Sequence, residues 1–221
     1  MYIIANKARW AAWEGICMKK VFIDGSAGTT GLRIKDRLMK RSDVELTTLS
    51  EEQRKDTESR KQALNSAQVA FLCLPDAAAV EAVELVENPD TVIIDTSTAH
   101  RTSEGWAYGF PELSAEFENK IKNSKRIAVP GCHAGGFIAL VYPLVEAGVL
   151  GNDALLSCYS LTGYSGGGKK MIAEYESEDK SPLLSAPRQY GLTQQHKHLK
   201  EIKGITGIEN APIFCLSLIH I

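Results

Sequence analysis

Cys132 is the residue of this sequence best placed for nucleophilic chemistry. It follows Pro130-Gly131, where a short apolar strand is predicted to end and a helix to begin. Free backbone N–H groups and the positive end of a helix dipole stabilise a thiolate at such a junction. A second unit of the chain is predicted to start at this point, and enzyme chemistry gathers at domain interfaces. We therefore predict that Cys132 is a nucleophile, although a lone cysteine is more often structural.

Two histidines, His196 and His198, could move a proton. They stand in Gln195-His196-Lys197-His198 and alternate as they would on a β-strand, which places both imidazoles on one face. No cysteine or acidic pair lies nearby at metal-ligand spacing, so we predict acid/base or anion-contact roles rather than a zinc site. Ordinary surface histidines are the alternative, and the other three histidines carry no independent signal.

A glycine-rich turn between a predicted strand and a predicted helix could hold a dinucleotide. A tight turn, a bare backbone near a pyrophosphate and a close strand-helix contact all require glycine. The spacing G-x-x-G-x-x-G differs from the usual fingerprint, so the surrounding strand-helix pattern carries the prediction. The alternative is a glycine turn without a ligand. The predicted cofactor contacts are Gly25, Ser26, Ala27, Gly28, Thr29, Thr30 and Gly31.

The end of the second predicted strand indicates which dinucleotide is bound. An NAD site normally places an acidic residue there for the ribose 2′-hydroxyl. Here the strand ends at Ser50, and Arg54 and Lys55 follow about one turn later. A hydroxyl with nearby cations suits a 2′-phosphate, so these three residues favour NADP. The alternative is that Arg54 and Lys55 only solvate a polar helix.

A second glycine cluster, Tyr164–Lys170, also lies between a predicted strand and a helix. Its Ser165, Gly166 and Gly168 would let a nicotinamide ring or an anionic substrate group approach the backbone. A plain flexible turn is the competing interpretation.

Strands alternate with helices from residue 18 to 129, which predicts a Rossmann-type α/β domain with a parallel sheet. A catalytic and dimerisation domain of α+β type is predicted over 130–221, and residues 1–17 are predicted to be an N-terminal extension. The predicted strands are 20–24, 44–49, 68–74, 91–95, 126–129 and 154–161, the predicted helices include 51–65, 76–87, 135–148 and 169–177, and 178–195 is predicted to be a loop.

Composition excludes several classes of protein. A net charge of -2 without a block of like charges argues against binding of nucleic acid or anionic lipid, which leaves a small molecule as the expected partner. No apolar run approaches the ~18 residues of a membrane span. Five irregularly placed cysteines form no disulfide framework, so we expect a reducing cytoplasm. Cys73 and Cys158 lie in apolar strands and are predicted to be core thiols.

Six ordered motifs together resemble the N-acetyl-gamma-glutamyl-phosphate reductases of the shorter type, enzymes of arginine biosynthesis within the semialdehyde dehydrogenase superfamily. The motifs are Phe22–Leu32, Leu74–Asp76, Asp95–Arg101, Trp106–Leu113, Pro130–His133 and His196–His198. Six motifs in order are far more specific than any one of them.

The resemblance implies an NADPH-dependent reductase that uses a cysteine thioester. Cys132 would be the nucleophile, His196 or His198 or both would provide the acid/base group, and Leu74 and Pro75 would lie beside the cofactor. The substrate would be N-acetyl-L-glutamyl 5-phosphate, the product its semialdehyde, and the full-length enzyme a homo-oligomer. An aspartate-semialdehyde dehydrogenase shares the cysteine, the cofactor and the mechanism, so it remains an alternative. A non-catalytic NADP-binding module with Cys132 as a redox sensor is another.

The resemblance covers about residues 18–214. The first 17 residues precede the family's usual start, and residues from about 216 do not continue its pattern. We therefore expect a second domain that is truncated at its C-terminal end and exposes an unpaired sheet edge.

Overall fold

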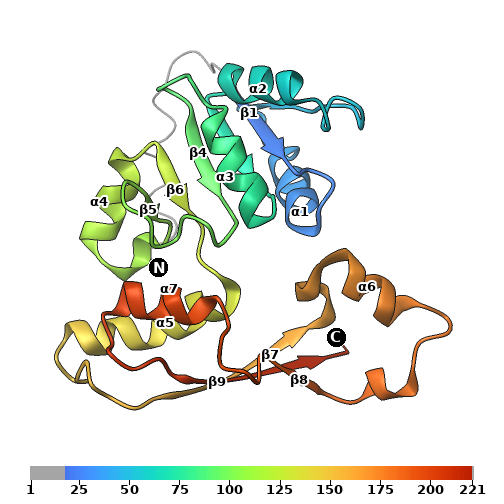
Figure 1. Ribbon diagram of the computed structural model, residues 1–221. Helices are drawn as coiled ribbons and strands as arrows, with labels where there is room; N and C mark the ends of the chain where they lie inside the picture. Colours follow the sequence, from blue (N-terminus) through green and yellow to red (C-terminus); the bar gives the residue numbers. More distant parts are fainter. Residues whose placement is uncertain (1–17, 221) are drawn as a thin grey trace.

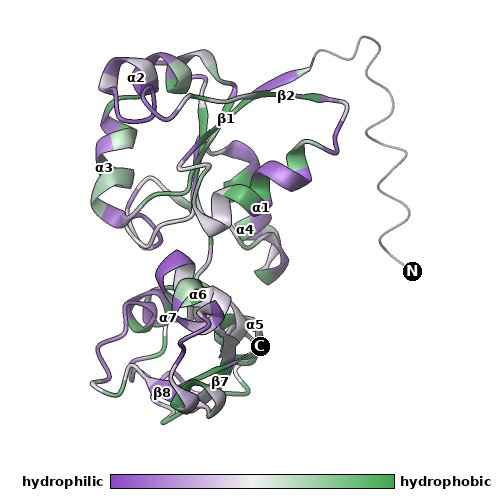
Figure 2. Ribbon diagram, turned by 90° about the vertical axis from the view of Figure 1, so that its right-hand side faces the viewer, coloured by the Kyte–Doolittle hydropathy of each residue, from purple (hydrophilic) through white to green (hydrophobic). Residues whose placement is uncertain are grey.

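The computed structural model describes residues 18–220 in two lobes, one above the other in Figure 2. Residues 1–17, the predicted N-terminal extension, and Ile221 lie outside the described residues. The elements of the first lobe are β1 (Lys19–Asp24), α1 (Thr29–Leu38), β2 (Val44–Thr47), α2 (Thr57–Ser66), β3 (Val69–Leu72), α3 (Asp76–Glu84), β4 (Val92–Asp95), β5 (Ala107–Tyr108), η2 (Pro111–Leu113), α4 (Ala115–Asn123) and β6 (Arg126–Ala128). Those of the second are α5 (Cys132–Glu146), β7 (Ser157–Gly163), η3 (Tyr164–Gly167), α6 (Gly168–Glu176), η4 (Pro182–Ser185), β8 (Arg188–Tyr190), α7 (His198–Thr206) and β9 (Ile213–Ile219).

The first lobe is built on a six-stranded sheet in the order β2-β1-β3-β4-β6-β5, and every neighbouring pair is parallel. Its central strands carry short apolar runs because both faces of a parallel sheet are covered by helices. Val21, Phe22 and Ile23 of β1 are all buried. The predicted Rossmann-type α/β fold is confirmed.

The strand order reverses between β1 and β3. From β1 the chain moves outward to β2, and it then returns to β3 on the other side of β1 before continuing to β4. Ligands of open α/β sheets bind outside the carboxyl ends of the strands at such a switch point. In this chain the glycine turn 25–31 follows the carboxyl end of β1, so the topology places it at the switch point.

The second lobe contains a three-stranded mixed sheet in the order β7-β9-β8. β9 lies in the centre and is parallel to β7 but antiparallel to β8. Helices α5 and α7 pack against each other beside this sheet (Figure 1). Residues 216–219, where the sequence was expected to leave the family's pattern, belong to this central strand, which ends at Ile219 and is hydrogen-bonded to both neighbouring strands.

One apolar core crosses from the first lobe into the second. Tyr108 of β5 belongs to the same cluster of buried side chains as Phe137 and Ile138 of α5, Ile202 of α7 and Phe214 of β9. Phe117 of α4 packs against that cluster. The last strand and helix of the parallel sheet are therefore joined to the second lobe by apolar contact. A separate core lies under α2 and α3 and includes Phe22, Leu64 and Leu72.

The helix predicted over 51–65 begins later, at Thr57. Ser50 and Gln53 make the two predicted capping bonds, from Ser50 N–H to Gln53 Oε1 at 3.0 Å and from Gln53 N–H to Ser50 Oγ at 3.2 Å. These bonds close turns over 51–55 rather than a helix, and Asp56 caps α2 by accepting from the N–H of Ser59. The capping bonds predicted at Ser50 and Gln53 therefore form, but the helix does not begin there.

Several elements, among them β5, α4 and β8, had no counterpart in the sequence prediction. The strand β5 has only two residues, and α4 follows it over Ala115–Asn123, capped by Ser114. The strand β8 lies inside the predicted loop 178–195. All three are short, and β8 exists because it pairs with the end of β9. Among residues 18–220, no helix combines the length and hydropathy needed to cross a bilayer.

Candidate active site

The glycine turn after β1 needs two of its three glycines for purely steric reasons. Gly25 has φ +82°, and a Cβ there would lie 2.2 Å from the carbonyl oxygen of Cys73. A Cβ on Gly31 would lie 2.4 Å from the carbonyl oxygen of Gly25. At Gly28 an added Cβ would make only ordinary van der Waals contact, 3.4 Å from the carbonyl oxygen of Gly25 and 4.0 Å from that of Cys73, so the protein's own packing does not require a glycine there. A glycine at the N-cap of α1 that packing does not require fits the close approach of a pyrophosphate group.

The neighbouring residues predicted to contact a cofactor lie at the same end of the sheet. Leu74 follows β3 and its Cδ2 would be 3.2 Å from a Cβ on Gly25, and Pro75 is the exposed N-cap of α3. Beyond β2, Ser50 and Lys55 are exposed and Arg54 is half-buried. The Nε of Arg54 is buried without a hydrogen-bond partner among the described residues. An orphaned guanidinium donor beside the switch point fits the 2′-phosphate of NADP.

A buried ion pair lies at the end of β1, directly before the glycine turn. Asp24, the last residue of β1, is 3% exposed, and its Oδ2 accepts bonds from Nε and Nη2 of Arg60 at 3.1 and 2.9 Å. Arg60 lies on α2 and also donates to Glu81 of α3 at 3.1 Å. One guanidinium therefore holds two helices against the end of β1.

Cys132 is the first residue of α5, three residues earlier than the predicted start of that helix, and it is exposed. Gly131 is the N-cap and makes no side-chain cap, so the N–H groups of the first turn are left to other partners. A cavity of about 430 Å³ opens at this helix end. It is lined by Cys132, His133, Thr162, Gly166, Gly167, Met171, Arg188, Gln189, Tyr190, His196, Lys197, His198 and Leu218.

The two predicted histidines reach this cavity, but not from a strand as predicted. His198 is the first residue of α7 and His196 lies just before it. Their rings meet edge to face at 4.6 Å because the chain turns into the helix here, and the N–H of His198 donates to Nδ1 of His196 at 3.2 Å. That bond requires an unprotonated Nδ1, so a neutral His196 carries its proton on Nε2.

Burial keeps His198 neutral. Its side chain is 6% exposed, and burial, together with the neighbouring His196 and Arg101, lowers the pKa of His198 to about 3. Its Nδ1 has no hydrogen-bond partner among residues 18–220. Burial and the charge of Lys197 also lower the pKa of His196.

The segment before the histidines is tied to the second sheet. Gln194 adopts a left-handed backbone with φ 56°. Its side chain accepts from the N–H of Phe214 at 2.7 Å and donates to the carbonyl of Phe214 at 3.1 Å. These bonds cover the part of β9 that β8 does not reach. They hold the backbone two residues before His196 against the second sheet.

His133, to which the sequence analysis assigned no role, lies in the same cavity. Its Nδ1 is 2.7 Å from the hydroxyl of Ser160 and its Nε2 is 2.6 Å from that of Tyr190. Burial, assisted by His196, lowers the pKa of His133, so both contacts belong to a neutral ring. His133 therefore orients the Tyr190 hydroxyl at the cavity wall. Its place directly after Cys132 was the only sequence signal available.

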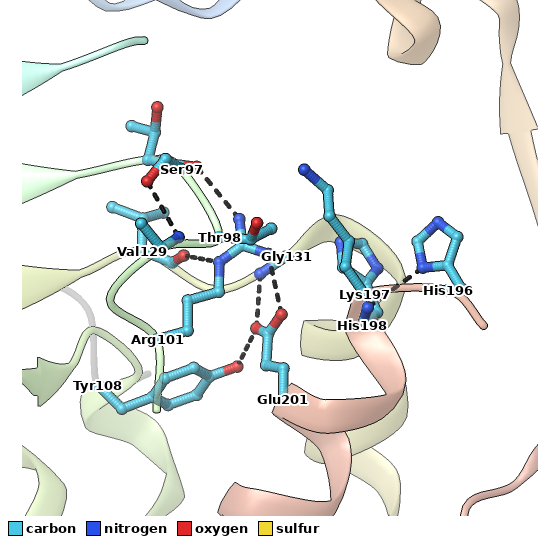
Figure 3. Close-up of polar contacts among 12 residues, drawn as sticks. Ser97, Thr98, Arg101, Tyr108, Val129, Gly131, His196, Lys197, His198 and Glu201 are labelled. Atoms are coloured by element: carbon cyan, nitrogen blue, oxygen red, sulfur yellow. Dashed lines mark hydrogen bonds and ion pairs between the residues drawn. The ribbon is translucent and has the colours of Figure 1, made fainter. Parts of the chain in front are cut away.

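Glu201 on the first turn of α7 was also missed, and it joins the two lobes (Figure 3). It is 2% exposed, and three donors converge on its carboxylate. Tyr108 Oη and the backbone N–H of Gly131 both donate to Oε1 at 2.7 Å, and Arg101 Nη1 donates to Oε2 at 2.9 Å. Arg101 also donates to the carbonyl oxygens of Val129 and Thr96. Burial, with the Glu201 charge, raises the pKa of Tyr108 far above its usual value.

A second contact between the lobes involves Lys197. Its side chain extends away from Glu201 in Figure 3, and its Nζ is 3.6 Å from Oδ2 of Asp76. Asp76 begins α3 directly after Leu74-Pro75, and it also accepts from the N–H and the hydroxyl of Thr98. The residue between the two histidines is thus linked to the cofactor side of the first lobe.

The second glycine turn faces the first lobe. Gly166 lines the cavity with Cys132, Ser165 is exposed, and Gly168 has φ +78°. The helix α6 that follows lies on the side of the second lobe nearest the first in Figures 1 and 2. The turn therefore lies on the side of the second lobe that a ligand bound to both lobes would contact.

The remaining described cysteines lie elsewhere. Cys73 is half-buried, and burial raises the pKa of its thiol to about 11. Cys158 packs against the shared core, and burial raises its pKa as well. All four cysteines within 18–220 are free thiols. No cluster of His, Cys, Asp or Glu in this part of the chain has the geometry of a metal site.

Comparison with known proteins identifies the family. Residues 20–123 match the family described as semialdehyde dehydrogenase, NAD binding domain, and residues 132–217 match the family described as semialdehyde dehydrogenase, dimerisation domain. The chain belongs to the semialdehyde dehydrogenases. The glycine turn 25–31 lies within the first match, and Cys132 is the first residue of the second.

The curated relatives carry one name. The chain is 48% identical over 194 residues to N-acetyl-gamma-glutamyl-phosphate reductase of Chelativorans sp. (strain BNC1). It is 48% identical over 196 residues to N-acetyl-gamma-glutamyl-phosphate reductase 2 of Pseudomonas putida. Each alignment covers 88% of this chain, and the chain spans 62% of the length of each relative. The resemblance stated from the six motifs is confirmed.

Solved structures of semialdehyde dehydrogenases share the fold. Aspartate semialdehyde dehydrogenase II of Vibrio cholerae has a TM-score of 0.63 at 16% identity, covering 91% of this chain and 70% of its own. The enzyme of Candida albicans, solved with NADP, has a TM-score of 0.62 at 18% identity, covering 92% and 68%. At these identities the likeness establishes the fold alone.

Proposed function

We propose that this semialdehyde dehydrogenase performs the NADPH-dependent reduction of N-acetyl-L-glutamyl 5-phosphate to N-acetyl-L-glutamate 5-semialdehyde, with release of phosphate. The observation that carries the proposal is the position of Cys132. It is an exposed thiol at the N-terminus of α5, in a cavity that also contains three histidines whose pKa values are lowered by burial, His133, His196 and His198. The curated relatives supply the substrate.

Cys132 starts the reaction in this proposal. The thiolate attacks the acyl carbon, phosphate leaves with the electrons of the broken C–O bond, and a thioester remains on Sγ. NADPH, when bound, supplies a hydride to that carbon. Hydride addition leaves a tetrahedral alkoxide, which takes a proton from an acid/base group as the thiohemiacetal forms and returns it as the C–S bond breaks to free the thiolate and the semialdehyde. N–H groups of the first turn of α5 are placed to stabilise the oxyanion.

His198 is the acid/base group we favour. Its Nε2 would be 2.4 Å from a Cβ on Gly131, which places the imidazole against the residue before the nucleophile. His196 would hold the backbone of His198 through the bond to its Nδ1. A thiolate formed nearby would raise the pKa of His198 toward the range that proton transfer requires.

The residues at the switch point support NADPH as the cofactor. Gly28 leaves room for the pyrophosphate, and Arg54 has an unsatisfied guanidinium nitrogen at the ribose end. Gly25, Gly31, Leu74 and Pro75 would shape the same site. Ser50 and Lys55 would complete the contacts to the 2′-phosphate.

We further propose that residues 18–129 form the cofactor domain and 130–221 the catalytic domain, and that the protein acts in the cytoplasm as a homo-oligomer. The match to a dimerisation domain supports self-association. Large apolar side chains are exposed on β7 and β9, including Tyr159, Leu161 and Ile213. Light scattering of the purified protein would measure its mass in solution, and a monomer at all concentrations would contradict this part of the proposal.

The test is the reverse reaction, with NADPH formation from NADP, phosphate and N-acetylglutamate semialdehyde. Cys132→Ser should abolish phosphate-dependent NADPH formation and leave NADPH binding intact. Cys215→Ser is the matched control, because Cys215 is a half-buried thiol that lines neither of the two cavities beside Cys132, and it should retain activity. Near-normal turnover by Cys132→Ser would contradict the proposal. Faster turnover of aspartate semialdehyde in the same assay would favour the alternative substrate.

A further inference from the structure

The carboxylate of Glu201 is buried and hydrogen-bonded to three protein donors, so it is not open to substrate. It is 2% exposed, is absent from the lining of the cavity, and accepts from Tyr108, Gly131 and Arg101. The chain separations of these contacts are 93, 70 and 100 residues. Each donor comes from a different segment, and one of them is the backbone directly before Cys132.

The same helical turn also carries His198. Glu201 follows His198 by three residues on α7, so the two side chains share one face of the helix. The ring of His198 lies against Gly131, and Arg101 Nη1 would lie 2.5 Å from a Cβ at that position. Gly131 is therefore held between a hydrogen bond to Glu201 and direct contact with His198 and Arg101.

We propose that Glu201 is a positioning residue, which fixes the distance between the Cys132 thiol and the His198 imidazole by holding the N–H of Gly131 to α7. The inference rests on the proposed role of Cys132 as the nucleophile. Through Tyr108 and Arg101 the same carboxylate connects this pair of groups to the first lobe, where the cofactor turn lies. One buried anion thus couples the nucleophile, the acid/base group and the cofactor domain.

The chemistry of an amide makes Glu201→Gln a sharp test. Oε1 faces two donors and Oε2 faces a third. A glutamine of the same shape has one acceptor oxygen and one NH₂ group. Whichever way the amide turns, its NH₂ faces either the guanidinium of Arg101 or the N–H of Gly131. The variant therefore breaks the arrangement without removing volume from the core.

The experiment measures two quantities on Glu201→Gln and on Glu209→Gln, an exposed residue that serves as the matched control. The first is the rate of alkylation of Cys132 by iodoacetamide at pH 7, followed by mass spectrometry of its peptide. The second is the separation of kcat from the KM for NADPH. A misplacement of about 1 Å costs on the order of 100-fold in rate. We expect kcat of Glu201→Gln to fall by about that factor, alkylation to slow at least threefold, and the KM for NADPH to change less than threefold.

The alkylation measurement needs no substrate, so it distinguishes failure of this inference from failure of the proposed function. If no substrate is turned over but alkylation slows only in Glu201→Gln, the proposed function fails and the positioning role stands. Wild-type alkylation and kcat in Glu201→Gln overturn the inference. If that variant does not fold, Glu201→Asp decides, because it keeps the charge beside Arg101 but is one methylene too short for the N–H of Gly131. Wild-type alkylation in Glu201→Asp likewise overturns the inference.

Discussion

The imidazole of His198 occupies the space that a side chain at Gly131 would need. An added Cβ would lie 2.4 Å from its Nε2, and both residues are buried. Glycine at this position is therefore required by packing and not by backbone conformation, because φ of Gly131 is -68°. The contact brings the residue before Cys132 within van der Waals range of α7.

Gly131→Ala should consequently displace side chains of the site without straining the backbone. Overpacking of a buried position costs about 1–3 kcal/mol, and relief would require displacement of His198 or Arg101. We expect a lower free energy of unfolding in urea and a loss of kcat of more than tenfold. Gly136→Ala is the control on the same helix, since a Cβ there meets nothing within 4 Å, and it should be neutral or slightly stabilising. Equal activity of the two variants would contradict the packing argument.

Gly28→Ala should remove cofactor binding without unfolding the protein. The nearest protein atom to the new Cβ would be 3.4 Å away, so folding is little affected, whereas the methyl group would occupy the space assigned to the pyrophosphate. We expect NADPH affinity, measured by fluorescence titration, to fall at least tenfold while the urea midpoint changes little. Unchanged affinity would argue that this glycine turn holds no ligand.

Gly25→Ala should instead act on stability. Its Cβ would lie 2.2 Å from the Cys73 carbonyl in addition to the cost of φ +82°. Gly105→Ala isolates the second effect, because Gly105 has φ +79° and nothing within 4 Å. The expected loss at Gly105 is about 1–2 kcal/mol, and thermal unfolding should show a clearly larger loss at Gly25. A similar loss at both positions would mean that the turn can relax away from β3.

His198 should make the fold sensitive to acid. Its pKa is about 3 in the folded chain and ordinarily about 6.5. Between these values the unfolded chain binds the proton, so stability is complete above pH 6.5 and falls as the pH drops toward 3. The slope is about 1.4 kcal/mol per pH unit for one such group. Urea unfolding at pH 7 and pH 5 should show a smaller difference for His198→Asn than for the wild type; an identical difference would contradict a buried neutral imidazole.

Arg60→Met should destabilise the first lobe strongly. It leaves the Asp24 carboxylate buried without its ion pair, and breaking such a pair costs about 3–5 kcal/mol. Lys61→Met on the same helix is the control, because the partner of Lys61 is the exposed Glu87, and surface pairs contribute about 0–1 kcal/mol. Thermal unfolding of both variants would check the difference. Equal effects would mean that Asp24 is not held as the structure shows.

Local patterns in the sequence were sufficient for the first lobe. Apolar runs of four or five residues separated by helices can bury both faces only in a parallel sheet, and that sheet is present. The glycine turn and the position of Cys132 at a strand-helix junction follow from the same local reasoning. The alternation of His196 and His198 was misleading, since a two-residue spacing cannot distinguish a strand from the turn that begins a helix.

The sequence by itself determined the fold class and predicted the cofactor turn and the nucleophile, because each depends on residues that are neighbours in the chain. The tertiary structure decided which contacts hold the residue before Cys132. Glu201 and Arg101 are 100 residues apart and would be expected in isolation to be solvated charges. Their burial follows from β5, α5 and α7 meeting in one apolar core. The hydrogen bonds that Tyr108, Gly131 and Val129 make to the pair offset the cost of removing both charges from water.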